Sequence, residues 1–156
     1  MIYVDSSSLV KRYLLEAGTD ALNARLAQED HVVTSVLTYA EIHSALARKH
    51  RERWLSRKSF QMVRRAFDRE WAILERVRIT DEVLSRVPRL LERYPLRAND
   101  ALQLSSALLF SPALVFVSSD LRLLEAADGC RLKAWNPAAH ESSGAGPFPG
   151  DRGDLI

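Results

Sequence analysis

Four acidic residues occupy comparable places in this chain, because each follows a short apolar run or opens a segment with helical spacing. Asp5 ends the apolar run in "IYVDSSS", and Asp120 ends the run in "LVFVSSD". Glu41 and Asp100 fall near the starts of the helical segments "TYAEIHSAL" and "NDALQLSSAL". Successive acids are 36, 59 and 20 residues apart, so each belongs to a different element.

A cluster of carboxylates predicts a particular chemistry. Negative charges held close together raise one another's pKa unless a cation neutralises them. The sequence does not place a Lys or Arg beside each acid, so a hard divalent ion with oxygen ligands, Mg²⁺ or Mn²⁺, suits the cluster. Such an ion binds phosphate oxygens and orients a water for attack. The pattern therefore favours hydrolysis of a phosphodiester bond.

Each acid also has an ordinary structural interpretation. Asp and Ser side chains cap helix N-termini, and acids are favoured in the first helical turn. Thr38 and Glu41 have the spacing of a capping box, in which Glu41 binds the N-cap N–H. For any single acid, capping is the better interpretation. Four acids at one predicted edge favour a shared site.

Short apolar runs alternate with helical patterns along most of the chain. Segments 39–50 and 59–74 have helical spacing, and Pro88 falls inside a helical pattern that it should kink or divide. The alternation predicts an α/β fold with a parallel sheet covered by helices on both faces. The runs expected to form strands are Ile2–Val4, His31–Thr34, Val77–Ile79, Leu114–Val117 and Leu132–Trp135.

This fold class explains how the acids can meet. The carboxyl ends of parallel strands lie along one edge of the sheet, and sites form where the strand order reverses. Asp5 and Asp120 would face each other if their strands are neighbours. Glu41 and Asp100 would join them, because helix starts face the same edge in right-handed βαβ units.

Composition limits the class of protein. The 156 residues are 47% hydrophobic and 27% charged, which suits one globular domain. The single Cys130 excludes an internal disulfide and a four-cysteine zinc site. No signal peptide is visible, and the most apolar segment, 107–117, is too short to span a bilayer, so we expect a soluble cytoplasmic protein.

Two regions differ from the rest of the chain. Residues 48–70 hold nine Lys or Arg against three acids, although the whole chain has a net charge of only +2. This basic segment suggests a polyanionic partner, and a solvated helix face is the alternative. The last 16 residues hold four of the six glycines and two of the six prolines. They predict a flexible tail over 138–156 after a folded domain over 1–137.

In these motifs the chain resembles the PIN-domain family, and within it the VapC-like toxins of toxin–antitoxin pairs. The matching segments are "YVDSSSLVKRYLLE", "TYAEIHSAL", "NDALQLSSAL", "FVSSDLRLLEAA" and "GCRLKAWNP". They occur in the family's order and cover roughly residues 1–137.

The resemblance implies a three-layer sandwich with a five-stranded parallel sheet in the order 3-2-1-4-5. It implies that Mg²⁺ or Mn²⁺ is bound by the four acids, that Ser118 orders the site, and that Ser7 is a small hydroxyl near the first acid. Family members are metal-dependent endoribonucleases, often homodimeric, and a small antitoxin blocks them. We therefore expect an endoribonuclease toxin with RNA as substrate, an antitoxin and a second copy as partners, and no membrane association. The acids are Asp5, Glu41, Asp100 and Asp120.

Two other functions stay open. A non-catalytic PIN-like relative would bind RNA without cleaving it, and metal-dependent cleavage separates the two. Asp5 could instead be the nucleophile of a phosphatase, but such enzymes usually carry a second Asp two residues later, where this chain has Ser7.

Overall fold

The computed structural model describes residues 1–110 and 113–139, which form a parallel sheet between two layers of helices. The sheet has five strands in the order β3-β2-β1-β4-β5, which confirms the predicted fold class and strand order. Neighbouring strands all pair in parallel, with Tyr3 opposite Val33 on one side and Phe116 on the other. The strands are β1 (Ile2–Val4), β2 (Val32–Ser35), β3 (Glu75–Val77), β4 (Val115–Val117) and β5 (Lys133–Trp135).

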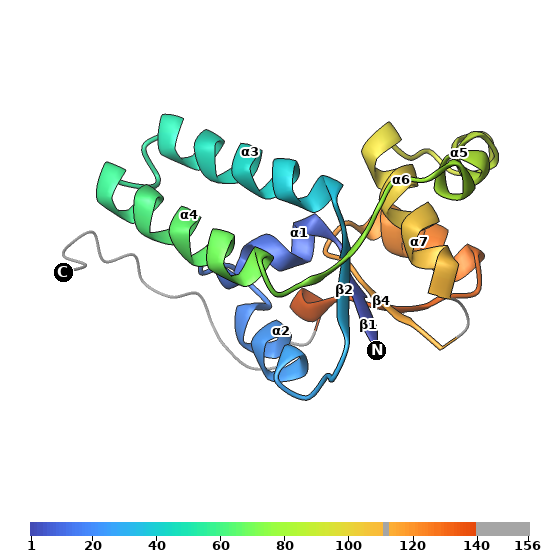
Figure 1. Ribbon diagram of the computed structural model, residues 1–156, viewed down its shortest axis with the longest axis horizontal. Coiled ribbons are helices and arrows are strands. Elements are labelled where there is room, and N and C mark those ends of the chain that lie inside the picture. The colour runs from blue at the N-terminus through green and yellow to red at the C-terminus, as the bar shows by residue number, and fades with distance from the viewer. Residues whose placement is uncertain (111–112, 140–156) are drawn as a thin grey trace.

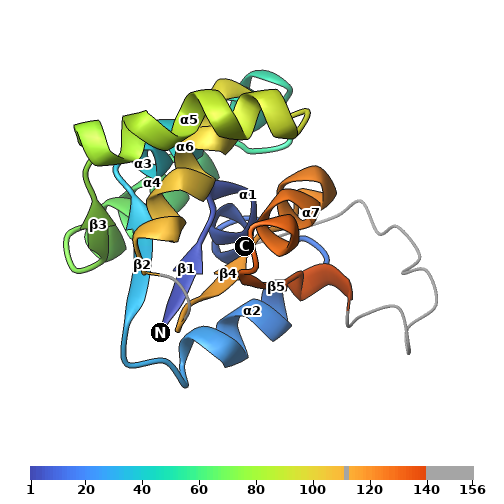
Figure 2. The same cartoon turned by 90° about the vertical axis from the view of Figure 1, so that its right-hand side faces the viewer.

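Helices cover both faces of this sheet. Figure 1 shows α1 to α4 on one side of the strands and α5 to α7 on the other, and Figure 2 turns the side with α5 to α7 toward the viewer. The helices are α1 (Ser6–Leu9), α2 (Thr19–Leu26), α3 (Leu37–Arg51), α4 (Arg57–Trp71), α5 (Asp81–Arg93), α6 (Ala98–Ala107) and α7 (Leu121–Gly129). Short 3₁₀ turns, η1 (Val10–Arg12) and η2 (Leu108–Phe110), follow α1 and α6.

The central strand β1 contributes to both hydrophobic cores, because successive side chains of a strand point to opposite faces. Ile2 and Val4 pack with the residues under α1 to α4, whereas Tyr3 packs with those under α5 to α7. All three side chains are fully buried. Burial on both faces explains why this strand is a continuous apolar run.

The longest helices, α3 and α4, form an antiparallel hairpin that extends from the sheet (Figure 1). The Ser56 hydroxyl caps α4 by accepting a hydrogen bond from the Ser59 N–H. Phe67 of α4 is fully buried against the α1 to α4 core, and His43 of α3 contacts Asp68 across the hairpin at 3.1 Å. The hairpin thus buries one face and leaves the other to solvent.

Two local predictions differ from the structure: the end of β3, and the division of the helix that holds Pro88. Strand β3 ends at Val77, two residues before the predicted end, because it is an edge strand whose Glu75 and Arg76 are exposed and hide the apolar pattern. Pro88 does not divide its helix, since α5 runs unbroken through it. Pro88 and Leu84 are both exposed, so water can satisfy the Leu84 carbonyl that loses its intrahelical partner.

Two further predictions concern the limits of the chain. The predicted tail lies outside the described residues, apart from residues 138 and 139. Within the described part of the chain, we find no helix with the length and apolar character needed to cross a membrane.

Candidate carboxylate site

Asp5 lies directly after β1 and is 3% exposed. Its Oδ2 atom accepts hydrogen bonds from the Ser7 hydroxyl at 2.5 Å, the Ser7 N–H at 3.2 Å and the Ser118 hydroxyl at 3.1 Å. The pKa of Asp5 is raised to about 6, because burial and the charge of Glu41 raise it by more than the hydrogen bonds from Ser7 and Ser118 lower it. Asp5 is therefore a carboxylate whose charge is only partly compensated by the protein.

A serine network joins the ends of β1 and β4. The Ser7 hydroxyl lies 3.2 Å from the Ser118 hydroxyl and accepts a hydrogen bond from the Ser119 N–H at 3.0 Å. The Ser118 hydroxyl also accepts from the Asp120 N–H at 3.1 Å. Because β1 and β4 are neighbours, as predicted, this network fixes the segment that carries Asp120 beside the one that carries Asp5.

Asp100 and Asp120 form a second pair at this edge. Asp120 caps α7 through its Oδ1 atom, which accepts from the N–H groups of Arg122 and Leu123 at 2.9 and 3.3 Å. Asp100 lies in the first turn of α6, and its Oδ2 atom accepts from the Arg97 N–H at 3.2 Å. Partial burial raises the pKa of Asp100, and the charge of Asp120 raises it too, while Arg97 and Arg122 act in the opposite direction. Capping and charge coupling therefore occur in the same side chains.

Glu41 is held differently from the capping box that its spacing suggests. Helix α3 begins after Val36, which makes no side-chain cap, so the capping-box interpretation is wrong. The Oε2 atom of Glu41 instead accepts a hydrogen bond from Nε2 of Gln103 at 2.6 Å. The sequence interpretation missed Gln103, although an uncharged polar residue inside the apolar pattern of "ALQLSSAL" is a usable signal.

The structure brings the acids together in pairs and at one edge. The charge of Glu41 raises the pKa of Asp5, and the charge of Asp120 raises the pKa of Asp100. Among the described residues, however, no three His, Cys, Asp or Glu side chains lie close enough together to hold a metal ion. The prediction of a four-carboxylate metal site thus stays a prediction.

The oxygen atoms of the four acids are suited to a hard cation. Within residues 1–110 and 113–139, hydrogen bonds hold only one oxygen each of Glu41, Asp100 and Asp120. The second oxygen of Asp5 has one long contact, at 3.4 Å from the Ser6 hydroxyl. No salt bridge to any of these acids is formed by the described residues. Carboxylate oxygens that form no salt bridge with the described residues fit Mg²⁺ or Mn²⁺.

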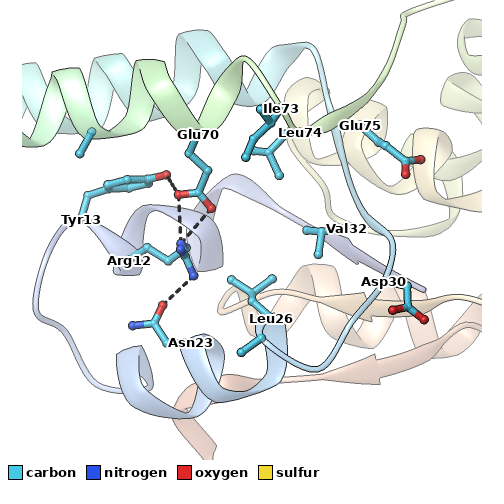
Figure 3. A pocket seen from close by; sticks show the side chains of 12 residues that line it. Arg12, Tyr13, Asn23, Leu26, Asp30, Val32, Glu70, Ile73, Leu74 and Glu75 are labelled. Atoms are coloured by element: carbon cyan, nitrogen blue, oxygen red, sulfur yellow. Dashed lines mark hydrogen bonds and ion pairs between the residues drawn. The ribbon is translucent and has the colours of Figure 1, made fainter.

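A separate pocket of about 760 Å³ lies at the opposite edge of the sheet, beside the first residues of β2 and β3. Figure 3 shows Glu70 bonded to both Arg12 and Tyr13, with Arg12 also donating to Asn23 at 2.9 Å. None of the four acids lines this pocket. It is therefore distinct from the carboxylate edge.

Comparisons with known proteins agree with this architecture. Residues 2–129 match the family model described as PIN domain. Two relatives are ribonuclease VapC45 of Mycobacterium tuberculosis strain CDC 1551 / Oshkosh and ribonuclease VapC49 of strain ATCC 25618 / H37Rv. Each is 32% identical over 135 residues, which cover 85% of this chain and 94% of the relative.

Solved structures share the fold at low sequence identity. A toxin–antitoxin complex from Klebsiella pneumoniae has a TM-score of 0.64 at 15% identity and covers 88% of this chain and 98% of its own. VapBC2 from Rickettsia felis, bound to a DNA fragment from its promoter, has a TM-score of 0.62 at 16% identity. The match covers 87% of this chain and 98% of the Rickettsia felis chain. FitAcB from Neisseria gonorrhoeae has a TM-score of 0.65 at 18% identity, and the match covers 88% of this chain and 98% of the Neisseria gonorrhoeae chain.

Proposed function

The chain belongs to the PIN-domain family, and from that premise we propose that it is a VapC-like ribonuclease toxin that hydrolyses RNA with Mg²⁺ or Mn²⁺. The metal ligands in this proposal are Asp5, Glu41, Asp100 and Asp120. The observation that carries it is the coupling of these acids in two pairs at one edge, without a salt bridge from the described residues. The names of the two relatives support RNA as the substrate.

The residues at this edge have separate tasks in the proposal. When bound, a divalent ion supplies charge neutralisation and an activated water. Asp5 would help to hold that ion through its carboxylate, which Ser7 and Ser118 keep from rotating by bonding Oδ2. The same bonds lower the pKa of Asp5 against the effect of burial, which keeps more of it ionised near neutral pH.

RNA is held in this proposal by the basic hairpin, residues 48–70 of α3 and α4. Eight of its nine Lys and Arg residues are exposed, all but Lys49. Helix α3 connects this charge to the site, since Glu41 and Arg51 are ten residues apart, about 15 Å along the helix axis. A phosphate backbone bound along the hairpin can therefore extend to the carboxylate edge.

A small antitoxin and a second copy of the chain are the protein partners in this proposal. One solved neighbour is itself described as a toxin–antitoxin complex, which supports the antitoxin, and the second copy rests on the family resemblance alone. Light scattering of the purified protein measures the second copy directly. A mass of one chain, 17.6 kDa, at micromolar concentration would contradict the homodimer.

The experiment that tests the function is cleavage of mixed cellular RNA by the purified protein. We expect defined fragments with Mg²⁺ or Mn²⁺, and none with EDTA or with the Asp100→Asn variant. RNA binding without cleavage would favour a non-catalytic RNA-binding module. Hydrolysis of a small phosphomonoester, with RNA left intact, would favour a phosphatase.

A further inference from the structure

Gln103 is a fully buried amide of α6 that contacts two other elements. Its Oε1 atom accepts a hydrogen bond from the Tyr3 hydroxyl of β1 at 2.6 Å. Its Nε2 atom donates to Oε2 of Glu41 at 2.6 Å and to the Thr38 hydroxyl at 3.0 Å, both on α3. One side chain therefore joins the strand that precedes Asp5 to the helix that carries Glu41.

The orientation of this amide follows from its partners. A carboxylate can only accept hydrogen bonds, so the atom that faces Glu41 must be the NH₂ group. The oxygen then faces Tyr3, whose hydroxyl donates to it. If the amide were flipped, the oxygen of Gln103 would lie 2.6 Å from the Oε2 atom of Glu41, and neither oxygen could donate a hydrogen bond. The contacts thus fix a single orientation of Gln103.

The hydrogen bonds continue in one direction beyond Gln103. Thr34 donates to the carbonyl of Val4 at 2.7 Å, so it accepts from Thr38, whose hydroxyl lies 2.8 Å away. Thr38 in turn accepts from Gln103. Tyr3, Gln103, Thr38 and Thr34 are all fully buried, and the chain of bonds ends at the residue before Asp5. Breaking one member leaves a buried polar group without a partner, which is costly.

A neutral amide suits this position better than a cationic side chain. Lys or Arg would form an ion pair with Glu41 and compete with a metal ion for its charge. Gln103 instead bonds only the Oε2 atom of Glu41. The negative charge of Glu41 and the Oε1 atom of Glu41 stay available for a metal ion. We propose that Gln103 is a positioning residue that fixes the Glu41 carboxylate for metal binding. This inference rests on the proposed function.

The first test is the affinity of the purified protein for Mn²⁺, measured by titration calorimetry. Gln103→Leu keeps a similar volume but removes the bond to Glu41, and we expect affinity to fall about tenfold or more, as for other outer-shell partners of metal ligands. Ser105→Ala is the matched control. Ser105 lies on the same helix, is fully buried and donates to the Val83 carbonyl at 2.6 Å, but contacts none of the four acids. We expect it to bind Mn²⁺ within about twofold of the wild type, since the outer-shell effect is confined to partners of the ligands.

A double-mutant cycle separates positioning from general damage to the fold. In a Glu41→Gln background, Gln103→Leu should change Mn²⁺ affinity by less than about twofold, because the residue it acts through is already altered. In RNA cleavage, Gln103→Leu should lower kcat and leave KM unchanged, since a fully buried amide cannot contact RNA. If Gln103→Leu does not fold, Tyr3→Phe, which frees the amide by removing one hydroxyl, should lower Mn²⁺ affinity in the same direction.

The outcomes distinguish this inference from the proposed function. Wild-type protein that binds Mn²⁺, together with a weaker Gln103→Leu variant and a non-additive cycle, supports both. If the wild-type protein binds Mn²⁺ but no better than Gln103→Leu, or if the cycle is additive, the positioning role of Gln103 is overturned and the proposed metal site is not. Wild-type protein that binds no Mn²⁺ overturns the metal site and, with it, the role of Gln103.

Discussion

Replacing Asp5 with asparagine should make the metal-free protein more stable at pH 8. The ordinary pKa of the carboxyl is 3.8, and in the fold it is raised to about 6, mainly by burial. Each pH unit between these values is about 1.4 kcal/mol, so the ionised side chain costs the fold about 3 kcal/mol above pH 6. Asparagine carries no charge and avoids this cost.

The sign of the effect sets its pH dependence. A raised pKa means that the folded state binds the proton more tightly than the unfolded state does, so the cost is largest above pH 6 and disappears below about pH 3.8. At pH 5 about half of the cost remains, roughly 1.6 kcal/mol. The advantage of Asp5→Asn should shrink accordingly as the pH falls.

The substitution preserves most of the local hydrogen bonds. The asparagine oxygen can take the place of Oδ2 and accept from Ser7 and Ser118. Its NH₂ group then faces the place of Oδ1, where only the long 3.4 Å hydrogen bond from Ser6 disappears. The bonds to Oδ2 are therefore kept, and the cost of burying the new NH₂ group is set against the charge penalty of about 3 kcal/mol.

The assay is urea unfolding of both proteins in EDTA at pH 8 and pH 5. Asp30→Asn, a change at an exposed aspartate away from the carboxylate edge, is the control and should shift stability by less than about 0.5 kcal/mol. Added Mg²⁺ should then stabilise the wild type but not Asp5→Asn, because ligands stabilise the state that binds them. An Asp5→Asn variant no more stable than the wild type at pH 8, or an equal difference at both pH values, would refute the argument from burial.

Three further changes test other parts of the structure. Ser118→Ala removes a bond that lowers the pKa of Asp5, so the acidic limb of the pH–rate profile for RNA cleavage should move to higher pH; an unchanged limb would contradict this. Arg65→Glu, on the exposed face of the basic hairpin, should weaken RNA binding, measured by fluorescence anisotropy in EDTA. The slope of the logarithm of the binding constant against the logarithm of the salt concentration should become less steep by about 0.7 for each phosphate that the protein no longer neutralises. Arg89→Glu on α5 is its control, and equally weakened binding by both variants would mean that the charge effect is not specific to the hairpin. Phe67→Ala empties a fully buried position and should cost about 3–5 kcal/mol in urea unfolding; a cost below about 1 kcal/mol would show that this helix packs loosely.

Local pattern was enough to predict most of the sheet. The run Ile2–Val4 matches β1 without error, because a central strand is buried on both faces and its sequence is wholly apolar. The same pattern failed at β3, where edge residues Glu75 and Arg76 face solvent. Strand order came from the family resemblance, since β-strand residues carry no local record of which strand lies beside them.

The acids illustrate the limit of reasoning from single positions. Capping and a functional role were weighed as alternatives for Asp5, Asp100 and Asp120, yet the structure shows each of them accepting N–H bonds near a helix start. A cap uses only part of a carboxylate, so the rest of its charge can act on a neighbour. Only Glu41 has no capping role, and nothing in its own helix indicates the amide that holds it.

The sequence by itself determined the fold class, the strand ends and helix starts that carry the four acids, and the basic hairpin. These features depend on residues near one another in the chain, because the spacing of apolar residues and the residues that form turns and caps determine local structure. The tertiary structure decided the pairing of Asp5 with Glu41, the serine network between β1 and β4, and the orientation of Gln103. Charge coupling and hydrogen bonding depend on distance through space, and Tyr3 and Gln103 are 100 residues apart in sequence but 2.6 Å apart in the fold.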